Sequence, residues 1–267
     1  MDVESIFERY SIDKWFYFEP RDEHYCNFPP HVIFAAHKIA DVYQSFTNAR
    51  FFLGYMNVEN YGELIAKHDD LHLNFIRSRL LQSALSFYNY SIDLSWQVLW
   101  LYYGPSFYSL YDDPTYYYRE IEKCNRENLK VRLHLAKADY IMKHVDSFIG
   151  ESEVSKVRKK YNYLKHRGTF YTPGVGKQQS YLMGAVDGRK FKMIKREVFD
   201  IDEWTENLIN FDVLFFEYFE EIINWIMPRN YQDVQFNLVD ILKLNKKIEQ
   251  EKEFNEWQKS GGITAEH

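Results

Sequence analysis

The stretch KVRKKYNYLKHRGTF, from Lys156 to Phe170, sets an asparagine and a histidine one helical turn apart among six lysine and arginine residues. On a helix, Arg158, Asn162 and His166 would lie within about 80° of one another and share one face. Histidine ionises near neutral pH, so it can both accept and donate a proton. Neighbouring cations stabilise negative charge that develops on a phosphate. These groups could cleave RNA through its own 2′-hydroxyl without a metal.

The same residues also fit a purely structural role. Cations and a histidine are favoured at the C-terminal end of a helix, where the dipole is negative, and Gly168 suits a helix end. Val157 and Leu164 fall on the far side and are the expected core contacts. Spacing alone therefore leaves three alternatives open: a catalytic face, a polyanion site and a solvated helix end.

The charge of the chain is distributed unevenly. The 267 residues have a net charge of −6. Residues 156–196 hold twelve Lys or Arg and one acid, Asp187, whereas the rest of the chain holds 21 Lys or Arg and 38 Asp or Glu. An acidic body with one basic segment indicates a localised polyanion site. The alternative is a solvated face that folds against acids elsewhere in the chain.

A second basic element is predicted after the histidine. SYLMGAVDGRKFKMI contains two extended runs around Asp187–Gly188, which predicts a β-hairpin at about residues 180–196. Nearby Tyr171 and Tyr181 could stack on unpaired bases, although a charged strand edge that blocks aggregation is the alternative. The candidate nucleic-acid-binding residues are Lys159, Lys160, Lys165, Arg189, Lys190, Lys192, Lys195 and Arg196.

Helical periodicity surrounds these elements and determines the expected fold. Apolar spacing and breaker residues predict helices at about 30–54, 71–103, 125–149, up to 168, 200–227 and 238–257. The predicted fold class is mainly α, a helical bundle with an inserted basic β-hairpin. The expected domains are an N-terminal extension (1–29), the helical bundle with its hairpin (30–228), and a C-terminal charged helix and tail (229–267).

The end of the basic helix, YNYLKHRG, resembles the HEPN superfamily (higher eukaryotes and prokaryotes nucleotide-binding). That signature is an arginine, then a polar residue, three further residues and a histidine, and Asn162 and His166 match it. The upstream SFYNYSIDLSWQVLWLYYG also resembles helices of HEPN-like bacterial proteins, so the resemblance covers about residues 71–228.

The resemblance implies an all-α domain and, in many family members, a metal-independent endoribonuclease of a toxin–antitoxin or phage-defence type. Such proteins typically act as homodimers with two motifs facing one another. Other members are non-catalytic partners of nucleotidyltransferases. The implied partners are therefore RNA, a second copy of the chain, or a nucleotidyltransferase or antitoxin.

The sequence departs from the signature at Tyr161, which stands in the arginine position. Arg158 or Arg167 could supply the missing guanidinium, or a dimer partner's cations could, or the domain has lost catalysis and kept binding. Lysine is no simple replacement, because arginine offers a planar bidentate fork to phosphate. The predicted catalytic site is thus His166 as general base or acid with Asn162, Arg158, Arg167 and Tyr161.

The remaining sequence features exclude several classes of protein. HDDLH pairs His68 with His72 at a metal-compatible spacing, but Asp69 and Asp70 already fit a helix entry. There is no Walker loop, dinucleotide-binding glycine set or nucleophile elbow, and we expect neither a metal nor a cofactor. No apolar run approaches the ~20 residues that span a bilayer, and no signal peptide is evident. We expect a cytoplasmic protein that does not enter a membrane.

Overall fold

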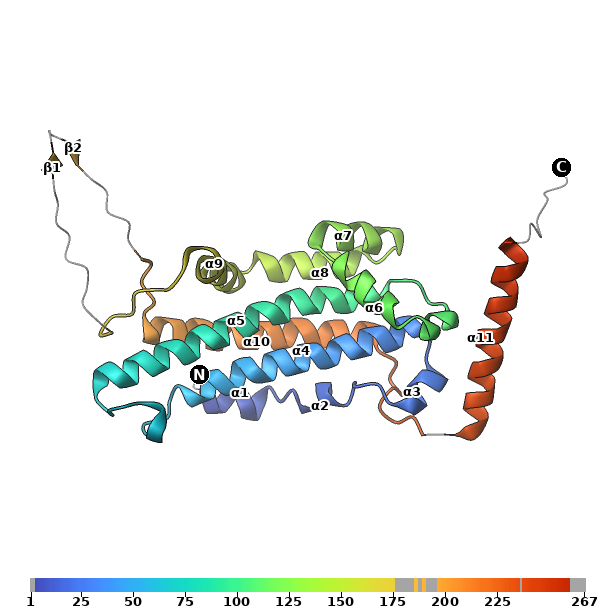
Figure 1. Cartoon of the computed structure of the whole chain (residues 1–267), viewed down its shortest axis with the longest axis horizontal. Coiled ribbons are helices and arrows are strands. Elements are labelled where there is room, and N and C mark those ends of the chain that lie inside the picture. Colours follow the sequence, from blue (N-terminus) through green and yellow to red (C-terminus); the bar gives the residue numbers. More distant parts are fainter. Residues whose placement is uncertain (1–2, 176–184, 187–188, 191–195, 236, 260–267) are drawn as a thin grey trace. The chain divides into compact units, whose positions relative to one another are not determined.

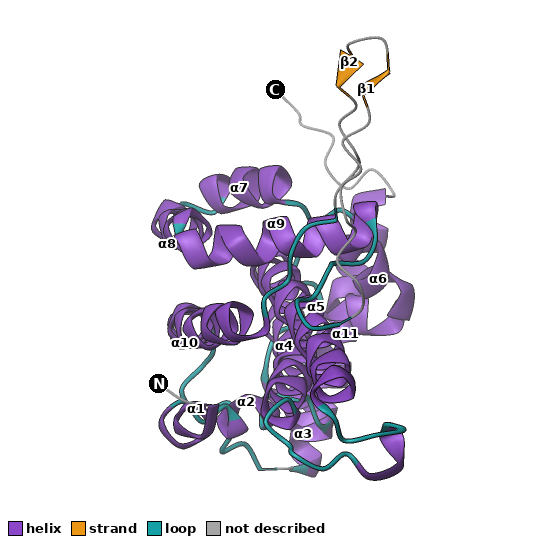
Figure 2. Cartoon of the chain, turned by 90° about the vertical axis from the view of Figure 1, so that its left-hand side faces the viewer, coloured by secondary structure: helices purple, strands orange, loops and turns teal. Residues whose placement is uncertain are grey.

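The computed structural model describes residues 3–175, 185–186, 189–190, 196–235 and 237–259. The chain is mainly helical, as Figures 1 and 2 show. The α-helices are α1 (Val3–Arg9), α2 (Asp13–Phe16), α3 (Asp22–Asn27), α4 (Pro30–Tyr55), α5 (Asp70–Tyr102), α6 (Pro114–Glu122), α7 (Arg126–Leu135), α8 (Asp139–Gly150), α9 (Ser152–Arg167), α10 (Ile201–Ile226) and α11 (Leu238–Lys259). Two 3₁₀ turns, η1 (Gly62–Leu64) and η2 (Tyr108–Asp112), join them. None of the described helices is long and apolar enough to cross a membrane.

The long helices confirm the periodicity of the sequence. α4, α5, α10 and α11 begin and end within two residues of the predicted bounds, and α9 ends within one residue of the end predicted at Gly168. The apolar residues that recur at helical spacing along α10 are all buried: Trp204, Leu208, Phe211, Phe215, Phe219, Ile222 and Ile226. Phe75 of α5 also falls at helical spacing with the apolar residues of that helix, but its side chain is 46% exposed.

The single helix predicted for residues 125–149 is wrong, since α7 and α8 are separated by residues 136–138. Lys137 has a φ of 59°, in the left-handed region. The amide of Ala138 donates to the carbonyl of Leu133, a bond that closes the end of α7. The break contains no glycine or proline, and the helical spacing of apolar residues continues across it. The sequence therefore contained no signal that one helix ends and another begins.

Two further helical regions were missed. α6 lies between the helices predicted at about 71–103 and 125–149, where no helix was predicted. Asp113 accepts a hydrogen bond from the amide of Thr115, and Pro114 occupies the first helical position. Residues 3–29, which show no clear period, form α1, α2 and α3. Their helices are too short to display a period, and Trp15 is nevertheless fully buried.

Of the segment predicted as a β-hairpin, only residues 185–186, 189–190 and 196 fall among the described residues. β1 (Ala185–Val186) and β2 (Arg189–Lys190) are antiparallel, with Ala185 opposite Lys190 and Val186 opposite Arg189. The remainder of the predicted arms, residues 180–184, 187–188 and 191–195, lies outside the described part of the chain.

The chain divides into two compact units, and each is assembled from separate stretches of sequence. Unit 1 contains residues 1–11, 45–90 and 148–215, and unit 2 contains residues 12–44, 91–147 and 216–267. α4, α5 and α10 each contribute to both units. The domain limits expected at residues 29 and 228 stay predictions.

The core of unit 1 encloses a charged pair among aromatic rings. Phe46 stacks on Phe215 with ring centroids 5.0 Å apart. Beside them, Arg50 donates from Nε and Nη2 to the two carboxylate oxygens of Asp212, at 2.9 and 2.7 Å. Tyr88 donates its hydroxyl to the same carboxylate at 2.7 Å. All the groups of this buried network are therefore hydrogen-bonded, as burial of charge requires.

In the core of unit 2, α2 and α3 pack against α10 and the segment that follows it. Trp15 packs edge-on against Phe219 with centroids 5.0 Å apart and donates its indole N–H to Glu220. The buried His24 ring stacks on Tyr231 at 4.3 Å. These contacts join residues that are more than 200 positions apart in sequence, which is why α2 and α3 hold their places despite their shortness.

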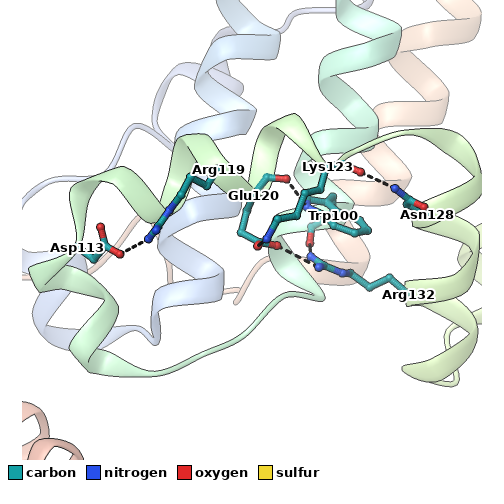
Figure 3. A network of polar contacts seen from close by, with 7 residues as sticks. All are labelled: Trp100, Asp113, Arg119, Glu120, Lys123, Asn128 and Arg132. Atoms are coloured by element: carbon teal, nitrogen blue, oxygen red, sulfur yellow. Dashed lines mark hydrogen bonds and ion pairs between the residues drawn. The ribbon is translucent and has the colours of Figure 1, made fainter.

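A polar network fixes α6 and α7 against the end of α5 in unit 2 (Figure 3). The guanidinium of Arg132 lies 3.1 Å from the centroid of the Trp100 ring and donates 2.7 and 3.1 Å hydrogen bonds to the Trp100 carbonyl and the Glu120 carboxylate. Glu120 is buried and also pairs with Lys123. Opposite charges hold its pKa below the usual range although burial, the largest effect, acts to raise it.

Candidate nucleic-acid interface

α9 is held in unit 1 by its apolar side. Val154 and Val157 are completely buried, which confirms the expected core contact of Val157, whereas Leu164 is only half-buried. The helix ends at Gly168, whose φ of 103° is one that residues with a Cβ rarely adopt. In the last two turns, Asn162, Lys165, His166 and Arg167 are exposed.

The exposed end of α9 carries most of the predicted site. Lys159, Asn162, Lys165, His166 and Arg167 are all exposed. Within the described ranges, no hydrogen bond or ion pair to another residue occupies any of these five side chains. Asn162 and His166 lie one helical turn apart on one face. Below, these five residues are called the α9 face.

The two other predicted catalytic residues lie closer to the protein body. Arg158 is half-buried. Tyr161 is also half-buried, and its ring meets Tyr90 of α5 edge-on, with centroids 5.6 Å apart and planes at 81°. The position at which the HEPN signature has its arginine is thus used here to pack α9 against α5.

Lys160 differs from the other lysines of this helix. Its ammonium donates to the carbonyl of Val198 at 2.8 Å and pairs with Glu197 at 3.2 Å. It also lies 4.9 Å from the centroid of the Phe170 ring and 5.2 Å from that of Trp204. Its side chain is only 13% exposed. Lys160 was expected to contact nucleic acid, but these bonds give it a role within unit 1.

We expect Lys160→Met to lower the free energy of unfolding by about 1–3 kcal/mol, because the Val198 carbonyl and Glu197 lose a charged donor. The measurement is urea unfolding followed by circular dichroism. Lys159→Met, at an exposed position of the same helix, should change that free energy by no more than about 0.5 kcal/mol. Equal effects of the two substitutions would contradict this role of Lys160.

The basic segment after α9 starts and ends next to that helix. Tyr171, half-buried, donates from its amide to Glu197 at 2.9 Å, and its carbonyl accepts from Phe199 at 2.8 Å. The Glu197 amide in turn donates to the Tyr163 hydroxyl. Arg196, exposed and adjacent to Glu197, therefore lies near α9. Arg189 and Lys190 belong to β2, while Lys192, Lys195 and Tyr181 lie outside the described residues.

His72, one of the two histidines of HDDLH, has a structural role at the start of α5. Asp69 accepts hydrogen bonds from the amide and from Nδ1 of His72, at 3.0 and 2.6 Å. The hydrogen bonds from His72 hold the pKa of the Asp69 carboxyl below its usual value. This is a helix N-cap, and no group of three or more potential metal ligands occurs in the part of the chain that the structure describes.

Comparison of the chain with known proteins identifies no relative. No family model matches the chain, and neither a curated protein nor a solved structure matches it. The resemblance to HEPN proteins therefore rests on the residues of the motif and on the helices that carry it.

One residue of this region was missed by the sequence reasoning. Tyr90 is 42% exposed and supports Tyr161. A signal was present, because the buried face of α5 contains Leu85, Tyr88 and Ile92, and Tyr90 falls away from that face on a helical projection. What the pattern could not supply was the neighbour, because Tyr161 is 71 residues further along the chain.

Proposed function

We propose that this protein engages RNA through the α9 face in the manner of a HEPN-like domain. The observation that carries the proposal is the α9 face itself: exposed Asn162 and His166 among three exposed cations. Lys156 to Arg167 contains no acid, so the positive charge of this helix end is not neutralised within it. A polyanion is the ligand class that such a surface attracts.

The predicted basic hairpin extends this surface in the proposal. The sequence places five lysine and arginine residues from Arg189 to Arg196. The short β1–β2 pairing supports the expectation that this segment is extended. Arg196 is exposed beside the anchored Glu197. We therefore include the segment as a second group of phosphate contacts, which would raise the salt dependence of binding.

In the catalytic form of the proposal, His166 acts as general base toward the 2′-hydroxyl. The 2′-oxygen forms a bond to the adjacent phosphorus, the 5′-oxygen leaves and takes a proton, and the products are a 2′,3′-cyclic phosphate and a 5′-hydroxyl. Asn162 would orient the imidazole or a phosphate oxygen, and Arg167 or Arg158 would stabilise the developing charge. The nucleophile belongs to the RNA, so this route requires no metal.

A specific observation favours a non-catalytic form as the second candidate. Tyr161 fills the motif's arginine position and packs on Tyr90, so that position supplies no guanidinium to a phosphate. A domain that holds RNA, or that serves as a subunit beside a nucleotidyltransferase or antitoxin, would retain the charged face without the arginine. A homodimer in which two α9 faces meet would instead allow the partner's cations to replace it.

The catalytic form is tested by incubating the protein with mixed RNA in EDTA. We expect wild-type cleavage to survive EDTA and His166→Ala to slow it by about 10²–10⁴-fold, because a general base contributes that much. His68→Ala, at another exposed histidine, is the matched control and should cleave normally. Binding without cleavage by the wild type would establish the non-catalytic form.

Binding itself is tested by titrating salt against affinity for single-stranded RNA. The plot of log K against log salt has a negative slope. Removing two phosphate contacts with Lys165→Gln and Arg167→Gln should make that slope less steep by about 1.4, at about 0.7 per phosphate. The control removes two exposed lysines from α7 and α8, Lys130→Gln and Lys143→Gln. The whole proposal fails if the wild type neither binds nor cleaves RNA.

A further inference from the structure

Six aromatic side chains of unit 1 form a continuous row that ends on α9. The centroids of successive rings lie between 4.4 and 5.8 Å apart. In order, the row consists of Tyr55, Phe51, Phe52, Phe87, Tyr90 and Tyr161. It passes from α4 across α5 and reaches the helix of the proposed RNA contact. We call these six residues the aromatic row.

Half of the aromatic row is open to solvent. Phe51 is 50% exposed, Tyr55 49% and Tyr90 42%. Unit 1 buries other aromatic side chains, such as Phe46 and Phe215, completely. Contiguous exposed apolar surface of this kind marks an interaction site on a folded protein.

The charge around the aromatic row selects the kind of partner. Neither Ser45–Tyr55 of α4 nor Leu71–Tyr90 of α5 contains an Asp or Glu, and Lys156–Arg167 of α9 contains six Lys or Arg and no acid. Of the acids of unit 1 that follow the basic segment, Glu197 pairs with Lys160 of α9, whereas Asp202 and Glu206 belong to α10 and are exposed. A partner with both flat apolar faces and negative charge fits this surface.

The last ring of the row brings stacking and charge together. On α9, Tyr161 lies three residues after Arg158 and four before Lys165, so both cations are its neighbours on the helix surface. Unpaired nucleobases stack on exposed aromatic rings while their phosphates follow nearby cations. A base-paired duplex hides its base faces, so it cannot use such a row.

We propose that the aromatic row is a base-stacking platform that makes single-stranded RNA the ligand of this protein. The inference rests on the proposed function and names its substrate class. A strand would place its phosphates along the α9 face and would stack bases on Tyr90 and, further along, on Phe51. Stacking on a ring tolerates any base, so the platform predicts affinity for unpaired RNA with little sequence preference.

The test compares three probes: an oligouridine that carries one 2-aminopurine, a blunt RNA duplex and inorganic polyphosphate. Tyr90→Leu keeps apolar volume but removes the flat ring, and Phe51→Ala is a second variant at a half-exposed site. We expect each to weaken oligouridine binding about tenfold and to reduce quenching of the 2-aminopurine. Affinity for the duplex and for polyphosphate should not change. Tyr118→Leu, at a 68% exposed tyrosine of α6, should bind all probes as the wild type does.

The other outcomes separate the platform from the proposed function. Wild-type RNA binding that both variants retain would overturn the platform and leave the α9 face standing. Equal loss for all three probes would overturn it too, because the ring would then act only through the fold. A wild-type dimer that Phe51→Ala and Tyr90→Leu convert to monomers would assign the row to a second copy of the chain. Absence of any RNA binding by the wild type would remove the proposed function itself.

Discussion

Asp212→Ala should lower the free energy of unfolding by about 3–5 kcal/mol, a large part of the 5–15 kcal/mol that stabilises a typical domain. The Asp212 carboxylate is completely buried and accepts hydrogen bonds from Arg50 and Tyr88. Its removal leaves the Arg50 guanidinium, which is 3% exposed, without a carboxylate partner, although Arg50 still donates to the Tyr10 carbonyl at 2.8 Å. An uncompensated buried charge of this kind is among the costliest changes a core can suffer.

Urea unfolding provides the measurement, and an unchanged m-value would show that the variant alters stability alone. Glu206→Ala, at an exposed position of the same helix, is the control and should shift stability by no more than about 0.5 kcal/mol. The double variant Arg50→Met with Asp212→Leu should regain most of the loss, because apolar groups of similar size replace a buried pair at little cost. A loss below about 1 kcal/mol for Asp212→Ala alone would show that the pair is dispensable.

The stability of unit 2 should fall as the pH drops below neutrality, and His24 is one of the groups responsible. Its Nδ1 accepts the Arg21 amide at 2.9 Å, and its Nε2 faces the Tyr231 carbonyl at 3.1 Å. An amide can only donate and a carbonyl can only accept, so the ring is neutral with its proton on Nε2. A second proton would set one N–H against another inside a buried site.

Burial, helped by the nearby Arg21 charge, lowers the pKa of His24 from its ordinary value of 6.5. Burial also lowers the pKa values of His31 and His37 in the same unit. The unfolded chain therefore binds these protons at a higher pH than the folded chain does. Their stabilising contribution is complete above the unfolded pKa and is lost as the pH falls from there toward the folded values.

Unfolding free energies measured between pH 7.5 and pH 5 test this expectation. For each proton that only the unfolded chain holds, stability should fall by about 1.4 kcal/mol per pH unit. His24→Gln should flatten the dependence, whereas His68→Gln, at an exposed position, should leave it as in the wild type. A slope that is unchanged in His24→Gln would exclude His24 as its source.

The sequence predicted the elements whose burial repeats at a regular interval. α4, α5 and α10 are long enough for the 3.6-residue period to appear, and their breakers, Pro30, Gly104 and Pro228, stand near their ends. α1, α2 and α3 were missed because helices of seven residues or fewer show no period. The division between α7 and α8 was missed because Lys137 adopts the left-handed conformation there. A glycine at that position would have predicted a helix end, whereas a lysine does not.

The candidate site divides in the same way. Sequence alone determined the local facts: the basic helix, the turn between Asn162 and His166, and the glycine at its end. Only the tertiary structure decided that Lys160 is held by Val198 and Glu197, that Tyr161 is supported by Tyr90, and that these rings join a row from α4. Helical neighbours follow from a fixed rise and rotation per residue, whereas contacts between distant segments depend on how the whole core packs.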